Sequence, residues 1–132
     1  MTQHDESTFK GLMTFALADG AAYDWNSAAR HIAVSYAAAL CAVSLPAEAD
    51  VTLWPPGLPM RDLYKLNTSA FGVSLVVAPT CTINGGGAGD DMNPIPGMAG
   101  NPSSSVLAQW VRVYRHTATD YYVFGAYDIG LL

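Results

Sequence analysis

The chain has 132 residues, carries a net charge of −5 with only six Lys and Arg, and is 51% hydrophobic but only 13% charged. These values allow one domain with one core and exclude a disordered chain, while so few basic residues exclude recognition of a nucleic-acid backbone. No apolar run reaches the roughly 20 residues that span a bilayer, and the start of the chain lacks the basic region of a signal peptide. We therefore expect synthesis in a cytoplasm and neither membrane nor nucleic-acid partners.

Residues 1–15 are predicted to form an N-terminal arm, followed by a single domain at 16–132. The first ten residues, MTQHDESTFK, are polar and acidic, and such termini are poorly ordered unless something ties them down. Phe9, Leu12 and Phe15 follow one another closely. They are candidates to anchor the arm to another protein.

The segment RHIAVSYAAALCAVSLP at 30–46 is ambiguous between helix and strand. Its alanines favour a helix, whereas Ile32, Val34 and Tyr36 alternate with small residues at the period of a strand. We interpret it as one long or two short strands that end at Pro46.

Six further segments carry strand signals, with β-branched and aromatic residues bounded by Gly and Pro. They are VTLW (51–54), RDLYKLNTS (61–69), GVSLVVAP (72–79), CTING (81–85), SVLAQWVRVYRH (105–116) and TDYYVFGAYDIGLL (119–132). The last two meet at HTATD, which is typical of a hairpin turn. In the first of them, Trp110, Arg112 and Tyr114 share one face, and Val111 and Val113 share the other.

This spacing of strands and turns predicts an all-β fold. We expect a compact antiparallel sandwich or barrel of seven to nine short strands.

A long irregular stretch at 85–105 interrupts the strands, and loops of this length usually bind something or lie over another surface. Its GGGAGDD run lacks the Lys of a phosphate-binding loop, and no long helix follows, as a dinucleotide site requires. Its DDMN run lacks the ligand spacing of a calcium-binding EF-hand. We interpret the stretch as a surface or intersubunit loop without a catalytic role.

No other motif predicts catalysis or a metal site. His4, His31 and His116 are far apart in the sequence, and no GxSxG nucleophile elbow is present. Cys41 and Cys81 are too few for a disulfide framework and are interpreted as buried free thiols rather than a bridge. The expectation is a protein without enzymatic activity, metal or cofactor.

The low charge and the surplus of aromatic strand residues predict self-association. A chain with this little charge can bury its spare apolar faces by assembling, and a closed cyclic trimer does so without leaving an open end. The candidate interface residues are large apolar side chains on predicted strands: Trp54, Tyr64, Ile83, Trp110, Tyr122 and Phe124.

From about residue 50 to residue 125, the order of segments resembles a pattern found in small β modules of bacteriophage structural proteins. The most specific matching pieces are Tyr64 with Asn67, the tetrapeptide TING at 82–85, and Trp110 followed by YYVFG at 121–125. Such modules occur in capsid decoration (head-fibre) proteins and in tail fibres or tailspikes, commonly as homotrimers. The chain departs from the pattern in the stretch between Gly85 and Val106, which is usually much shorter.

The resemblance implies a virion protein without catalytic residues. Because one small module and a short arm make up the sequence, with no shaft, we expect a capsid decoration (cement) protein. It would lie on the outer head surface as a homotrimer, with the major capsid protein as its partner. The alternative is a tail-fibre or host-surface (glycan) recognition module, and a small enzyme or lectin-like protein unrelated to phages is a third possibility.

Overall fold

The computed structural model describes six segments of the backbone: residues 15–19, 22–26, 28–35, 40–66, 71–98 and 106–130. They contain nine strands: β1 (Phe15–Asp19), β2 (Ala22–Asp24), β3 (His31–Ser35), β4 (Cys41–Ser44), β5 (Gly57–Leu66), β6 (Val73–Val76), β7 (Thr82–Ile83), β8 (Val106–Arg115) and β9 (Asp120–Gly130). These segments contain no helix, which confirms the all-β prediction for the described part of the chain. The predicted number of strands also agrees, although β5, β8 and β9 are long, with 10, 10 and 11 residues.

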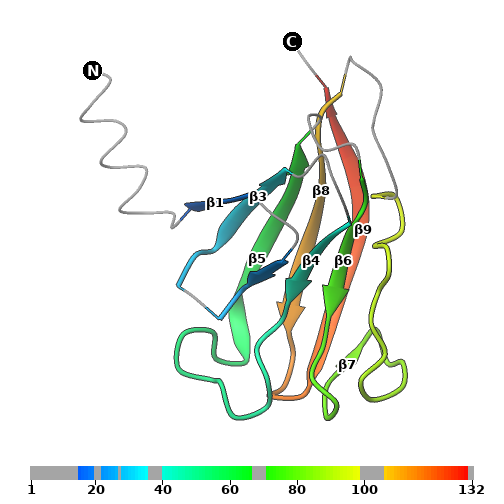
Figure 1. The fold of residues 1–132 in the computed structure, drawn as a ribbon. Helices are drawn as coiled ribbons and strands as arrows, with labels where there is room; N and C mark the ends of the chain where they lie inside the picture. Colours follow the sequence, from blue (N-terminus) through cyan, green and yellow to red (C-terminus); the bar gives the residue numbers. More distant parts are fainter. Residues whose placement is uncertain are drawn as a thin grey trace, which may run out of the picture.

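The strands form a six-stranded sheet in the order β1-β3-β5-β8-β9-β7 and a three-stranded sheet in the order β2-β4-β6 (Figure 1). As far as β6, the chain alternates between the two sheets, and each strand from β3 onward runs parallel to the strand two before it. Phe15 pairs with His31, and His31 pairs in turn with Asp62. The first six strands therefore wind as a coil whose successive turns lie side by side.

The predicted antiparallel arrangement is wrong for most strand pairs, although the hairpin predicted between β8 and β9 is confirmed. Five of the seven strand pairings between described strands are parallel, and only β5–β8 and β8–β9 are antiparallel. Neither sheet closes into a barrel. Parallel neighbours need a long crossover. Among the first six strands each crossover contains a strand of the other sheet, whereas β7 and β9 are joined through β8 of the same sheet. The strand and turn signals in the sequence are the same for parallel and for antiparallel pairing, so they did not reveal the strand directions.

The ambiguous segment at 30–46 contains two short strands, β3 and β4, as one of the two interpretations predicted. They belong to different sheets, β3 to the six-stranded sheet and β4 to the three-stranded sheet. The predicted faces of β8 are also confirmed, because Val111 and Val113 are fully buried whereas Arg112 is exposed.

The hydrophobic core contains side chains from both sheets and the loops that join them. Its fully buried members include Ile32, Val34, Leu63, Val111 and Val113 from the six-stranded sheet, and Val43, Val73 and Leu75 from the three-stranded sheet. At one end of the core, the ring centroid of Trp54 lies 5.3 Å from that of Trp25 and 5.7 Å from that of Tyr121.

Residues 51–54 do not form the predicted strand. They lie in an irregular loop whose carbonyl groups are bound by buried arginines instead of a neighbouring strand. Arg115 Nη1 donates to the carbonyl of Trp54 at 2.7 Å, and its Nη2 donates to the carbonyl of Ala47 at 2.8 Å. Arg61 donates to the carbonyl of Leu53 at 2.7 Å. Burial lowers the pKa of Arg61 to about 10, so it keeps its charge at neutral pH.

The long Gly/Pro stretch packs more closely than the sequence suggested. Met92 exchanges two backbone hydrogen bonds with Leu75 of β6, at 2.9 and 3.0 Å, and Ile95 N donates to the carbonyl of Val73 at 2.7 Å. The side chains of Ile95 and Met98 are 1% and 0% exposed. The expectation of a purely surface loop is therefore corrected for residues 85–98, which cover the edge of β6 and add two side chains to the core. Residues 99–105 lie outside the described part of the chain.

Candidate binding surface

The side of the six-stranded sheet that faces away from the core carries a continuous set of large side chains, which we call the outer face. Strand register fixes their positions: Tyr64 pairs with Trp110, Asp62 with Arg112, Arg112 with Phe124, and Tyr114 with Tyr122. Because side chains alternate along a strand, these residues share one face while their neighbours enter the core.

A row of rings crosses β3, β5 and β8 on the outer face. The ring centroids of His31 and Tyr64 are 6.3 Å apart, and those of Tyr64 and Trp110 are 6.4 Å apart, with interplanar angles of 28° and 22°. Burial raises the pKa of the Tyr64 hydroxyl, so this group is uncharged at neutral pH. The row is a rigid aromatic platform.

The carboxylate of Asp62 lies beside this row between His31 and Arg112. Its side chain is 6% exposed, with Oδ1 accepting a hydrogen bond from Arg112 Nε at 2.7 Å and Oδ2 lying 3.1 Å from His31 Nδ1. The hydrogen bond to Asp62 raises the pKa of Arg112. Burial lowers the pKa of His31 and outweighs the opposing effect of Asp62. At neutral pH a charged arginine and a neutral imidazole therefore lie on either side of Asp62.

Two adjoining hollows lie over this cluster. One, of about 280 Å³, is lined by Met60, Trp110, Arg112 and Phe124. The other, of about 420 Å³, is lined by Arg30, His31, Pro59, Met60, Asp62 and Arg112. They share Met60 and Arg112, so together they form one groove, which we call the arginine groove.

The arginine groove holds the exposed positive charge of the described residues. Five Lys and Arg side chains fall in the described ranges; Arg61, Lys65 and Arg115 are buried, whereas Arg30 and Arg112 are exposed and line this groove. Arg112 also lies over the Trp110 ring, 5.1 Å from its centroid. A partner in this groove would therefore meet two cations and an aromatic surface together.

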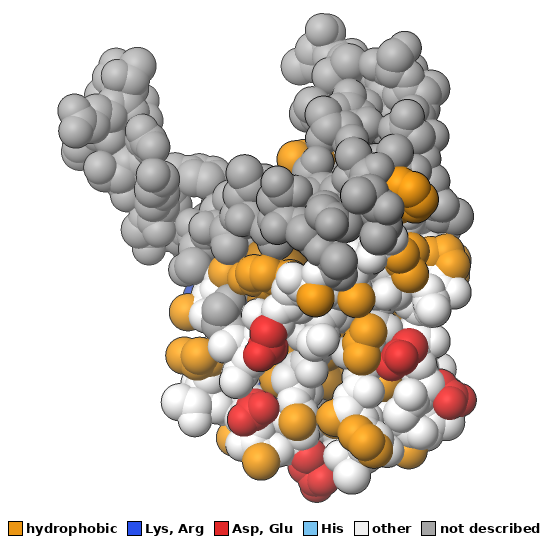
Figure 2. Space-filling model, in the orientation of Figure 1, with side chains coloured by type: hydrophobic (Ala, Val, Ile, Leu, Met, Phe, Trp, Pro, Cys, Tyr) orange, Lys and Arg blue, Asp and Glu red, His pale blue; other side chains and the backbone are white. Residues whose placement is uncertain are grey.

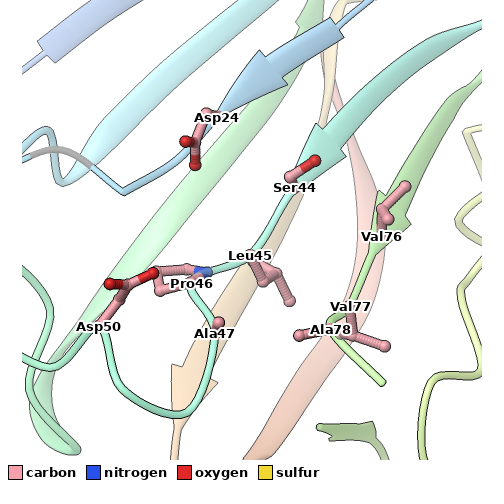
Figure 3. Close-up of a pocket in the computed structure, with 9 residues that line it drawn as sticks. All are labelled: Asp24, Ser44, Leu45, Pro46, Ala47, Asp50, Val76, Val77 and Ala78. Carbon is pink, nitrogen blue, oxygen red and sulfur yellow. The ribbon is translucent and has the colours of Figure 1, made fainter. Parts of the chain in front are cut away.

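A third hollow, of about 350 Å³, lies at the end of the three-stranded sheet. Figure 3 shows Asp24 at the end of β2 and Asp50 on the loop after β4 along one side, with Val76 to Ala78 along the other. We call it the acidic hollow. Around it, acidic side chains are scattered among hydrophobic and polar ones, and basic side chains are nearly absent from this view of the described surface (Figure 2).

The structure places the six predicted interface residues in two different environments. Tyr64, Trp110, Tyr122 and Phe124 lie together on the outer face, and the last two are 40% and 46% exposed. Trp54 and Ile83 lie in the core of the chain and are unavailable to a second copy. Among the predicted arm anchors, Phe9 and Leu12 lie outside the described residues, and the backbone of Phe15 begins β1.

The sequence did not single out Arg30, His31, Asp62 and Arg112 as members of one site. The alternation of Asp62 and Tyr64 about Leu63 was a usable signal for part of it, because it places the two on the same face of β5. His31 begins β3, Arg30 directly precedes it and Arg112 belongs to β8, and only strand pairing brings them to Asp62.

The TING tetrapeptide has a structural role in joining β7 to β9. Thr82 Oγ1 donates to Asp120 Oδ1 at 2.9 Å, and Asn84 Oδ1 accepts a hydrogen bond from the backbone N of Val123 at 2.8 Å. Asn84 and Gly85 have φ angles of 54° and 73°, in the left-handed region that Asn and Gly tolerate best. The motif therefore ends the short strand and turns the chain away from the sheet.

Within the described segments, no three His, Cys, Asp or Glu side chains are placed to hold a metal ion. Cys41 and Cys81 are buried free thiols, as expected from the sequence. The same segments hold no helix that is long and apolar enough to cross a membrane.

The chain matches no protein-family model, no curated protein and no solved structure.

Proposed function

We propose that this chain is a non-enzymatic structural protein of a bacteriophage virion, and specifically a capsid decoration protein that binds the outer head surface and stabilises it. The observation that carries the proposal is the outer face, where four predicted interface residues lie side by side on a stiff sheet. Aromatic side chains and arginine are the types enriched in protein contact surfaces. The TING tetrapeptide and Trp110 with YYVFG resemble phage β modules, and this resemblance is our reason for proposing a virion protein.

The same face supports assembly of the chain as a homotrimer. Exposed Phe124 and Tyr122 and half-buried Trp110 are costly to leave in water, since burial of apolar surface stabilises by about 25 cal/mol per Å². A specific interface of about 800 Å² per partner is ordinary in size. Closed cyclic assembly covers such a face on every copy.

The experiment is attachment to purified phage heads that lack their decoration protein. The protein should cosediment with the heads at saturating stoichiometry and raise the temperature at which they release DNA. Heads that neither bind the protein nor gain stability would refute the capsid assignment. A variant that lacks residues 2–14 but keeps Phe15, the first residue of β1, should attach less tightly if the arm is an anchor.

The second candidate function is recognition of a host-surface glycan by a tail fibre. The arginine groove favours it, because Trp110 and Phe124 supply aromatic surface beside the polar groups of Asp62 and Arg112. Binding of the isolated protein to host cells or to a glycan array, with no binding to heads, would select this candidate over decoration.

A further inference from the structure

We propose that the chain assembles head to tail, with the arginine groove of one copy facing the acidic hollow of the next, so that their opposite charges meet. This inference rests on the proposed self-assembly and specifies its partner surface and polarity. Its basis is the unequal distribution of charge over the described surface.

The positive side of this contact is the arginine groove. Its two cations, Arg30 and Arg112, are the exposed Lys and Arg side chains within the described ranges. One oxygen of Asp62 already binds Arg112, and the other lies against His31, so among the described residues that line the groove two arginines accompany one carboxylate. The groove therefore attracts a further carboxylate.

The negative side is the acidic hollow itself. Among the residues whose side chains the structure describes, the exposed acidic ones are Asp24 on β2, Glu48 and Asp50 on the loop after β4, and Asp90 and Asp91 on the loop after β7. On the paired strands β5 and β8 of the outer face, the one acidic residue is Asp62, which is buried. The hollow combines the carboxylates of Asp24 and Asp50 with apolar surface from Leu45 and Val77. The acidic hollow therefore presents negative charge beside apolar surface, and the arginine groove presents positive charge beside apolar surface.

This polarity decides between two kinds of symmetric contact. In a two-fold contact the same patch meets itself, which would bring the cations of two arginine grooves together. A head-to-tail contact pairs unlike patches and closes into a ring when the rotation allows it. Complementary potentials chiefly set the partner and the register of an interface, so the charges select a ring of a single polarity.

The test is a charge swap on the full-length protein, measured by sedimentation velocity over a range of concentrations at low salt. Arg30→Glu changes an exposed side chain and keeps the backbone carbonyl that accepts the Asp62 amide at 2.8 Å. Asp50→Lys changes an exposed side chain of the acidic hollow. Each single variant should raise the dissociation concentration about tenfold or more, and the double variant R30E/D50K should recover most of the loss.

Glu48→Lys is the matched control, because it makes the same charge change two residues from Asp50 on a side chain that does not line the hollow. It should leave assembly unchanged, and circular dichroism should show all four variants folded. Full rescue needs both substitutions in one chain, because an odd-numbered ring cannot alternate two single variants.

The outcomes separate the inference from the proposed function. A wild-type protein that stays monomeric at every concentration removes the proposed self-assembly and this inference with it. A wild-type trimer that ignores the charge swap, loses assembly equally with Glu48→Lys, or shows no rescue overturns the inference alone. So does a two-fold dimer. Saturable binding of tetragalacturonate to the assembled protein that Arg30→Glu abolishes would show the groove open to an acidic saccharide, and would also overturn it.

Discussion

Asp62 and Arg112 form an ion pair of unequal exposure: the Asp62 side chain is 6% exposed, whereas the Arg112 side chain that holds it at 2.7 Å is 45% exposed. The surrounding sheet shields the Asp62 carboxylate from water, so its stability in the folded protein depends on the hydrogen bond from Arg112. We expect Arg112→Gln to lower the free energy of unfolding by about 1–3 kcal/mol, the cost of a buried group left unsatisfied. The loss should fall toward the lower end, because water can reach the vacated position.

A double-mutant cycle in urea unfolding measures this coupling. Asp62→Asn removes the charge that needs compensation, so Arg112→Gln should cost less in that background than in the wild-type protein. Equal costs in the two backgrounds would show that Arg112 stabilises the sheet by packing on Trp110 rather than through Asp62.

Stability should depend on pH through His31. Burial lowers the pKa of His31 in the folded protein, whereas the unfolded chain has the ordinary value near 6.5. The unfolded state therefore takes up the proton first, so the free energy of unfolding should decrease as pH falls below about 6.5 and should not depend on His31 above it. Asp62 opposes this change, and Arg112 and Arg30 reinforce it.

Urea unfolding at pH 7.5 and pH 5.5 checks the sign. His31→Gln should reduce the difference in stability between the two pH values, whereas His116→Gln, at an exposed position on the β8–β9 turn, is the control. A wild-type protein that is more stable at pH 5.5, with the gain lost in His31→Gln, would show that attraction to Asp62 outweighs burial.

Arg115 should be among the most costly residues to replace. Its side chain is fully buried and donates to the carbonyls of Trp54, Ala47 and Ala118 at 2.7–2.9 Å. Arg115→Met keeps much of the apolar stem but leaves these buried acceptors unsatisfied, so we expect a loss of about 3 kcal/mol or more. Arg30→Met, at an exposed position, should change stability by less than about 0.5 kcal/mol. Thermal unfolding of the two variants gives the comparison, and similar losses would contradict the role assigned to Arg115.

The fold could be predicted from the sequence where local patterns determine it, and not where contacts between distant residues do. Strand content followed from alternation and from Gly and Pro turn residues, and the two faces of β8 were correct because Val111 and Val113 alternate with Arg112. VTLW at 51–54 has the composition of a strand, but the carbonyl of Leu53 is bound by Arg61 and that of Trp54 by Arg115, which is 61 residues away in the sequence. Parallel pairing could not be predicted either, because no local signal distinguishes a strand that crosses to the other sheet from one that turns back.

The candidate surface was predictable only in part, for a related reason. Tyr64, Trp110, Tyr122 and Phe124 were identified as large strand side chains that one core could not hold. The same reasoning included Trp54, which lies in the core at a loop position. Arg30 and His31 lie far from Arg112 in sequence, so the arginine groove exists only through the pairings of β3 with β5 and of β5 with β8.

Gly72 should be intolerant of a side chain. A Cβ at this position would lie 2.8 Å from the backbone oxygen of Met98, closer than real Cβ atoms come to such atoms. Gly72→Ala should therefore push residues 94–98 away from the edge of β6 and lower stability by about 1–3 kcal/mol. Gly125→Ala is the control, because a Cβ there would meet nothing within 4 Å. Equal melting temperatures for the two variants would contradict the close approach at Gly72.

Within the Gly/Pro stretch, the buried side chain of Ile95 should contribute more to stability than the half-buried side chain of Met92. Ile95 is 1% exposed and belongs to the core cluster, so Ile95→Ala should cost about 2–5 kcal/mol, as for other buried Ile-to-Ala changes. Met92→Ala, at a half-buried side chain of the same segment, should cost less.

Replacement of residues 86–98 by a short Gly-Ser linker should destabilise the domain strongly, because it removes Ile95, Met98 and the hydrogen bonds to β6 together. A polar surface loop would tolerate the same replacement, since loop closure depends only weakly on length. Urea unfolding decides between them: a linker variant as stable as the wild type would show that residues 86–98 do not hold the edge of β6 in solution.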